Sequence, residues 1–197
     1  MGENQNFYSR DLRKGDRGPG GGLIFYDAGS VHEWGRYLEV APNRWNGGGW
    51  GDPKRKFFKV PTDFVRPEFD DPLRYTLWGY DAFKIGAGKR NTQELIQLFE
   101  KGAAVTASEY SGGGKRDWYL PSVDELAQLA AFALNRKSWR VNDSEKPLPL
   151  STGFSIYPYW SSTIAGNESA FGHFFSYGEQ SAFNISYSAY VRPIRAF

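Results

Sequence analysis

The pattern of hydrophobic and polar positions first predicts a strand near the N-terminus. Glycines precede the apolar run from Leu23 to Tyr26, and a glycine-rich turn in front of such a run is typical of a short strand. From Asn43 to Tyr80 the chain consists mainly of Gly, Pro, Trp and charged residues, and neither a helical nor a strand period persists there. We therefore interpret residues 43–80 as an irregular insertion.

Two amphipathic helices are predicted in the middle of the chain. Asn91 is a good N-cap for the first helix, and Glu94 stands three positions later, where its side chain can reach back to the cap. An apolar stripe follows, and Gly102 is expected to end the helix. The stripe consists of Leu95, Ile96, Leu98 and Phe99.

The second helix is predicted to begin within the sequence PSVDELAQLAAFALN. Ser122 and Glu125 have the spacing of a capping box, in which each side chain bonds the backbone N–H of the other residue. Apolar residues then recur at helical intervals, which predicts one buried face. These residues are Val123, Leu126, Leu129, Ala130 and Ala133.

Short strands and loops are predicted after the second helix. The prolines of KPLPL resist helix formation, and glycines at positions 153, 166, 172 and 178 interrupt the alternating stretches beyond them. A strand-rich half that follows two helices is typical of an α+β fold. A length of 197 residues suits a single domain, which we take to span residues 1–197.

Composition and charge exclude several classes of function. The formal net charge of +2 does not provide the concentrated basic face that nucleic-acid-binding proteins present, so no nucleic-acid partner is expected. A chain without cysteine forms no disulfides or zinc–thiolate sites and has no cysteine nucleophile. No apolar run approaches the roughly 20 residues of a membrane span, so we expect no direct membrane insertion.

Motifs for catalysis or cofactor binding are weak. The sequence IGAGKRNT resembles a phosphate-binding loop, but Gly88 and Lys89 lack a glycine five residues earlier and a following Ser or Thr. The only histidines are His32 and His173, and neither stands near a nucleophile motif. No set of residues has metal-ligand spacing. We therefore expect the protein not to be an enzyme and to use no cofactor or metal.

The basic run KRKFFK supports an alternative function. Short charge runs are more often solvated loops, and acidic residues follow this one at positions 68, 70 and 71. The run would nevertheless suit a fixed adhesin that binds sulfated or acidic polysaccharide. Its basic residues are Lys54, Arg55, Lys56 and Lys59.

The segment from Ser155 to Tyr190 has an unusual composition. It contains eight serines, ten aromatic residues, two glutamates and no lysine or arginine, and its branched aliphatic residues are three isoleucines. A buried strand favours branched aliphatic residues. Antibody paratopes instead combine Tyr with Ser, Gly and Asn, because the ring offers a large contact area at low entropic cost. The composition alone fits a contact surface and a merely polar sheet equally well.

Six stretches of the chain, taken in order, resemble a known family. They are GDRGPGGGLIFYDAG, YLEVAPNRW, IGAGKRNTQELI, SGGGKRDWYLPSVDELAQL, YWSST and YVRPIRAF. Together they are similar to the domain at the C-terminus of bacterial collagen-like adhesins, from about Gly15 to Phe197 but outside residues 43–80. That family has a C-type lectin fold. The resemblance therefore implies two helices packed beside a small twisted antiparallel sheet, with the N- and C-terminal strands close together.

The resemblance also implies a framework and limits the chemistry. Enzymes related to this fold use cysteines, and its calcium-dependent sugar binders use Glu-Pro-Asn or Gln-Pro-Asp triplets; the sequence contains neither feature. Enzymatic activity and simple calcium-lectin binding are therefore not implied. The framework residues would be Asp117, Trp118, Leu120, Pro121, Trp160 and Arg192.

A narrower resemblance is to the variable proteins of diversity-generating retroelements, which use the same fold. These proteins vary ligand-binding residues in a C-terminal cassette by mutation of adenines, over a fixed backbone. Residue types that such codons reach dominate residues 155–190, whereas Trp160, Glu168, Glu179 and Gln180 would be fixed. The resemblance implies a diversifiable, paratope-like surface for a protein or glycan ligand. It leaves open display on a cell surface or a virion, or retention inside the cell.

The expected contact positions are spread over the segment from residue 155 to residue 190. They are Tyr157, Ile164, Asn167, Ser169, His173, Tyr177, Ser181, Phe183, Asn184, Ser186, Tyr187 and Ser188. Solvent exposure is expected of His173, Tyr177, Phe183, Asn184, Ser186, Tyr187 and Ser188. By contrast, Ala170, Phe175 and Gly178 are expected to be buried or to form turns.

Overall fold

A computed structural model shows a mixed α+β architecture in the residues that it describes. These are residues 12–42, 80–100, 102–140, 148, 150–151, 153–166, 169–184, 187 and 189–197. The strands are β1 (Leu23–His32), β2 (Gly35–Val40), β3 (Tyr159–Gly166), β4 (Ser169–Phe174), β5 (Glu179–Asn184) and β6 (Ile194–Ala196). The helices are α2 (Tyr80–Phe83), α3 (Gly88–Leu98), α4 (Ala103–Glu109) and α5 (Val123–Ala133), with a 3₁₀ turn η2 at Phe175–Tyr177. The predicted α+β class is confirmed.

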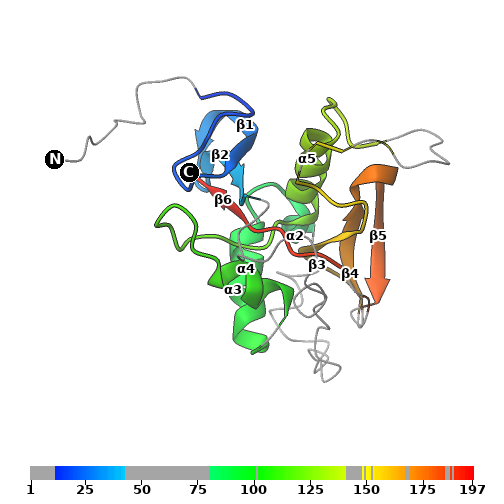
Figure 1. Cartoon of the computed structure of the whole chain (residues 1–197). Coiled ribbons are helices and arrows are strands. Elements are labelled where there is room, and N and C mark those ends of the chain that lie inside the picture. Colours follow the sequence, from blue (N-terminus) through cyan, green and yellow to red (C-terminus); the bar gives the residue numbers. More distant parts are fainter. Residues whose placement is uncertain are drawn as a thin grey trace.

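The described strands form two antiparallel sheets of three strands each. The first sheet has the order β1-β2-β6, and the second sheet has the order β3-β4-β5. In the first sheet Leu38 of β2 pairs with Ala196 of β6, so the expected proximity of the N- and C-terminal strands is confirmed (Figure 1). A single bridge joins Tyr190 to Tyr159 of the second sheet. The segment that carries Tyr190 and β6 therefore links the two sheets.

This arrangement differs from the implied two helices beside one sheet. The described chain also contains α2 and α4, which are only four and seven residues long. Such short helices produce little periodic signal, and α2 begins at the end of the segment expected to be irregular. Between Tyr190 and β6 stands Pro193, which has no N–H to donate to a strand ladder. The described strands form two sheets instead of the single implied sheet.

Helix α5 confirms the predicted capping box and buried face. The Glu125 N–H donates to Ser122 Oγ at 3.3 Å, and Glu125 Oε2 accepts the Ser122 N–H at 2.7 Å. The helix stands between the two sheets and contacts β1, β3 and β4 (Figure 1). Its buried Leu126 and Leu129 pack in one cluster with Phe25 of β1. The helix therefore forms the centre of the main hydrophobic core.

Helix α3 differs from its prediction at both ends. It begins at Gly88, so Asn91 lies inside the helix instead of capping it. Asn91 is buried, and its Nδ2 donates to the Ala82 carbonyl at 2.8 Å and to Ser162 Oγ at 3.3 Å. These tertiary partners satisfy the NH₂ group of Asn91, whereas an N-cap side chain would accept a bond from its own helix. The Asn91 Oδ1 atom is buried without a hydrogen-bond partner in the described part of the chain. The helix ends at Leu98, and Gly102 is the N-cap of α4.

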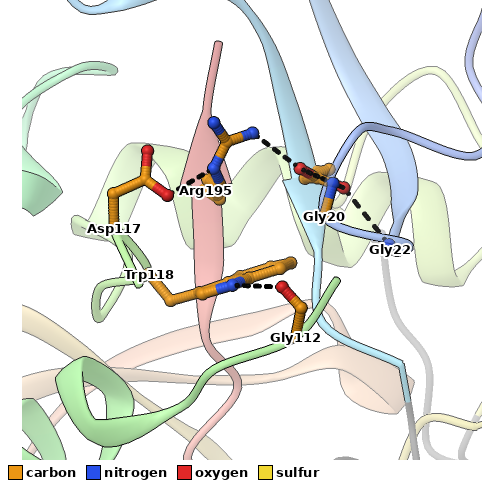
Figure 2. Close-up of polar contacts among 7 residues, drawn as sticks. Gly20, Gly22, Gly112, Asp117, Trp118 and Arg195 are labelled. Atoms are coloured by element: carbon orange, nitrogen blue, oxygen red, sulfur yellow. Dashed lines mark hydrogen bonds and ion pairs between the residues drawn. The ribbon is translucent and has the colours of Figure 1, made fainter. Parts of the chain in front are cut away.

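A buried ionic network connects the loop of Gly20 and Gly22, here called the glycine loop, to the first sheet (Figure 2). The Glu39 carboxylate is fully buried and accepts the Gly20 N–H at 2.9 Å and the Gly22 N–H at 3.2 Å. Arg195 of β6 donates to Glu39 Oε1 at 2.9 Å and also bonds Asp117. A Cβ at Gly20 would lie 2.7 Å from this carboxylate, so only glycine allows so close an approach.

Candidate ligand-binding surface

The second sheet has two unlike faces. Residues directly opposite each other on antiparallel strands project to the same side. Tyr159, His173 and Gln180 are opposite one another and lie on the face toward α5, where Gln180 Nε2 donates to the Val123 carbonyl at 3.1 Å. The second face carries the pairs Phe174 with Glu179, Gly172 with Ser181, and Ala170 with Phe183.

Over β3, this second face is covered by α3 and α4. The buried side chains of Trp160 and Ile164 pack there in one cluster with Leu95 of α3 and Ala104 of α4. Strand β5 lies on the outer side of the second sheet, away from these helices (Figure 1). The covered part of the face is therefore core, whereas β4 and β5 supply partly buried and exposed side chains among the described residues.

A row of aromatic rings, here called the aromatic strip, occupies the part of the face that β4 and β5 supply. It consists of Phe174, Tyr177, Phe183 and Tyr187. Phe174 contacts Tyr177 at 6.2 Å and Phe183 at 5.5 Å between ring centroids, and Phe183 stacks on Tyr187 at 5.3 Å. Tyr177 is 39% exposed and Tyr187 is 44% exposed. The strip thus presents large apolar surfaces with hydroxyl groups to solvent.

Buried framework residues support the aromatic strip from below. The Trp160 ring is 1% exposed and meets the Phe183 ring edge to face at 6.1 Å. Gly172 leaves space for Phe183, because a Cβ there would lie 2.8 Å from the Phe183 ring. On the other face, toward α5, Phe175 is fully buried against Tyr159 and His173, and Gly178 adopts the left-handed conformation at φ 58°. The predictions for Phe175 and Gly178 are confirmed, whereas Ala170 is only partly buried.

The predicted contact positions divide into three groups. Solvent-exposed residues are Tyr157, Tyr177, Asn184 and Tyr187, and partly buried residues are Ser169, Ser181 and Phe183. Buried residues are Ile164 and His173. Three predicted contact positions lie outside the described residues: Asn167, Ser186 and Ser188. The basic residues Lys54, Arg55, Lys56 and Lys59 also lie outside them, and so does all of the proposed insertion except Tyr80.

The prediction that His173 faces solvent is wrong. The residue lies on the face toward α5 and is fully buried, with edge-to-face contacts to Trp139 at 4.9 Å and Phe175 at 5.4 Å. Neither ring nitrogen has a hydrogen-bond partner in the described part of the chain. Burial lowers the pKa of His173 to about 4, so the ring is neutral near pH 7. It can neither contact a ligand nor act as an accessible base.

The expectation that Ile164 contacts ligand is also wrong. Only 7% of this side chain is exposed, because it packs beneath α3 and α4 on the covered part of the sheet. Isoleucine is one of the few branched aliphatic residues in the segment, and its chemistry already favoured the core.

Sequence reasoning missed Phe174 as a member of the surface. Two consecutive phenylalanines, Phe174 and Phe175, end β4 and begin η2, and Phe175 is the buried one. Neighbouring side chains of an extended chain point to opposite faces. The adjacent pair was therefore a usable signal that one of the two rings lies on the accessible side.

Tyr157 belongs to a different cluster of rings. It is 58% exposed, and its ring lies 6.0 Å from the Tyr190 ring, which contacts Tyr159 at 5.6 Å. Tyr190 bridges Tyr159 on the edge of β3 that is opposite β4. The structure therefore does not place Tyr157 in the row formed by the aromatic strip.

Glu125 and His32 have structural partners. Burial raises the pKa of Glu125 to about 7, yet its carboxylate accepts the Ser122 N–H of the capping box and also the Gly86 N–H and the Tyr119 hydroxyl. The His32 ring stacks on Trp34 at 5.3 Å. No group of three or more metal-ligating side chains occurs among the described residues. None of the described helices has the length and apolar content needed to cross a membrane.

Comparison with known proteins adds no relatives to this picture. The sequence matches no family model and shows no significant match to a curated protein.

Proposed function

We propose that the protein is a non-enzymatic binding protein that recognises a macromolecular ligand through the aromatic strip. One observation carries this proposal: four rings form a continuous row on the accessible part of the second sheet, above the buried ring of Trp160. A core strand would bury such rings, and a purely structural polar face would not gather them. Partly exposed tyrosines on a rigid support are typical of paratopes.

The energetics of the aromatic strip favour a binding role. Tyr177 and Tyr187 are among the largest exposed apolar side chains of the described chain. A few aromatic anchors usually supply most of the binding energy of an interface. Because the rings already contact one another, they lose little freedom when a ligand covers them. Ser181 lies beside them as an adaptable hydrogen-bonding neighbour.

We further propose a C-type lectin fold and a diversifiable surface of the retroelement type. The pairing of β2 with β6 supports the fold, and so does the burial of Trp118, Leu120 and Arg192. The contrast between buried Trp160 and exposed Tyr177, Asn184 and Tyr187 supports a fixed framework beneath variable positions. Sequencing of the encoding locus tests the diversification. A nearby reverse transcriptase gene and a repeat of the 3′ end that differs at adenines are expected, and their absence would contradict it.

Selection from a random peptide library tests the binding surface. The chain is immobilised, phage-displayed peptides are selected on it, and dissociation constants of synthetic copies are measured by calorimetry. Tyr177→Ala and Tyr187→Ala are each expected to weaken binding by about tenfold or more, as loss of an anchor does. Ile96→Ala is the matched control, because Ile96 on α3 is 41% exposed and lies outside the strip.

Two outcomes would contradict the proposal. One is the absence of any selected peptide that the soluble chain binds. The other is binding that Ile96→Ala weakens as much as the two tyrosine variants do. Thermal unfolding of each variant is measured in parallel, so that a loss of binding can be separated from a loss of structure.

A further inference from the structure

The aromatic strip carries one acidic side chain and no basic one. Glu179 begins β5, is exposed to solvent, and lies directly opposite Phe174 on the same face of the sheet. No lysine or arginine occurs between Ser155 and Tyr190. A single negative charge therefore adjoins an apolar surface, without a neighbouring cation in the segment to neutralise it.

The Glu179 carboxylate is held in place by a hydrogen bond to one of its two oxygens. Ser181 lies two positions along β5 on the same face, and its Oγ donates to Glu179 Oε1 at 2.7 Å. The second carboxylate oxygen, Oε2, has no hydrogen-bond partner in the described part of the chain. A carboxylate oriented by a serine can therefore accept a further donor from a ligand.

The rings beside this carboxylate suit a flat cation. Phe174, opposite Glu179, meets the Tyr177 ring edge to face, with 6.2 Å between the centroids. A guanidinium group is planar, donates in a fork that matches a carboxylate, and stacks on aromatic faces. Glu179 and the two rings therefore offer the two kinds of contact that an arginine side chain makes.

We propose that the aromatic strip takes a protein ligand that presents an arginine, which bonds Glu179 and stacks on one of the two perpendicular rings of Phe174 and Tyr177 while it contacts the edge of the other. This proposal rests on the proposed function and names the chemistry of the partner. Charge complementarity favours a basic protein loop over the other occupants. A sulfated or acidic polysaccharide would be repelled by Glu179, and a neutral glycan would use the rings without the charge.

The peptides selected on the immobilised chain provide the test. Arginine is expected to be enriched next to apolar residues in the selected sequences. Glu179→Gln is expected to weaken their binding by about tenfold, because one charge-assisted hydrogen bond is lost. Glu33→Gln is the matched control, since Glu33 is exposed in the turn between β1 and β2, and it is expected to leave the affinity unchanged.

A change in the peptide tests the same contact from the other side. Replacement of the selected arginine by citrulline keeps the shape of the side chain and removes its charge. Citrulline is expected to weaken binding to the native chain by about tenfold and to have much less effect on Glu179→Gln, because the two changes remove one interaction. The affinity for the arginine peptide is also expected to fall as salt rises.

The outcomes separate this proposal from the proposed function. Peptides that require Tyr177 and Tyr187 but bind Glu179→Gln unchanged, or that lack basic residues, would overturn the arginine site and leave the binding surface standing. Binding to a neutral glycan array that is equal for the native chain and Glu179→Gln would assign the strip to sugars. Failure to select any peptide would count against both proposals.

Discussion

Replacement of Glu39 by glutamine tests the reasoning about the buried network most directly. Oε1 of this carboxylate accepts the Gly20 N–H and the Arg195 guanidinium, both at 2.9 Å. Oε2 accepts the Gly20 N–H at 3.1 Å and the Gly22 N–H at 3.2 Å. A glutamine has an NH₂ group in place of one oxygen. In either orientation of the amide, a donor would face donors, and Arg195 would lose its buried ionic partner.

The expected cost follows from this geometry. Removal of one partner from a buried ion pair costs about 3–5 kcal/mol, because the other charge stays buried without compensation. The second partner of Arg195, Asp117, is 41% exposed and offsets only part of that loss. A domain of this size loses about 2–4 °C of melting temperature per kcal/mol. Glu39→Gln is therefore expected to lower the melting temperature by about 10 °C.

Equilibrium unfolding in urea at pH 7 measures the loss of free energy, and thermal unfolding at the same pH measures the fall in melting temperature. Asp27→Asn is the matched control, since it makes the same chemical change in the half-exposed pair of Asp27 with Arg36, where the nitrogen–oxygen distance is 2.9 Å. That pair is expected to contribute less than about 1 kcal/mol. If Glu39→Gln and Asp27→Asn destabilise the protein equally, the buried network does not secure the glycine loop and the reasoning fails.

Three further predictions concern the buried groups. The pKa of Glu125 is raised to about 7 in the folded chain, so this group makes stability fall by about 3 kcal/mol between pH 4.5 and 7. The pKa of His173 is lowered from 6.5 to about 4, so this group makes stability rise by about 3 kcal/mol over that interval. These two contributions to the pH dependence of stability oppose each other. The free energy of unfolding, measured as a function of pH, is therefore expected to rise with pH in Glu125→Gln, to fall with pH in His173→Phe, and to change less in the native chain. Parallel curves for the three proteins would refute the assignment of these pKa shifts to Glu125 and His173. Arg192 has one hydrogen bond, to the Gly153 carbonyl at 3.1 Å, and no carboxylate partner in the described chain, whereas Arg195 is paired with the buried Glu39. In urea unfolding, Arg192→Met is therefore expected to cost about 1 kcal/mol and Arg195→Met about 3–5 kcal/mol. Equal costs for the two variants would contradict this expectation. Gly172→Ala places a methyl group against the Phe183 ring. The variant is expected to destabilise the fold by about 1–3 kcal/mol and to weaken peptide binding. An unchanged melting temperature and affinity would show that the Phe183 ring does not need the space that glycine leaves.

The parts of the fold that sequence predicted well are those with a strong local cause. The capping box of Ser122 and Glu125 and the apolar period behind it defined α5, because both are properties of neighbouring residues. The strand at Leu23 was recognised from its preceding glycines, although β1 continues to His32. The start of helix α3 differs from its predicted position because Asn91 bonds Ala82 and Ser162 instead of capping the helix. Rules that consider only neighbouring residues do not include such distant contacts.

The exposure of the C-terminal segment was predicted for some residues and not for others. The excess of serine and aromatic residues drew attention to the segment that carries the aromatic strip, and Tyr177 and Tyr187 are exposed as predicted. Successive side chains of each strand point to opposite faces of the sheet, however, so the exposure of each residue depends on the register of its strand. His173 pairs with Tyr159 and Gln180 on the face toward α5, and this register buried a residue whose polarity suggested exposure.

By itself, the sequence determined the α+β class, the central helix and the chemical character of the C-terminal segment, since each follows from composition or from residues a few positions apart. Only the tertiary structure decided which rings form the aromatic strip, that His173 is buried, and that Glu39 and Arg195 meet. These features join residues up to 156 positions apart, as Glu39 and Arg195 are. Such contacts depend on strand pairing and packing, which short-range patterns do not specify.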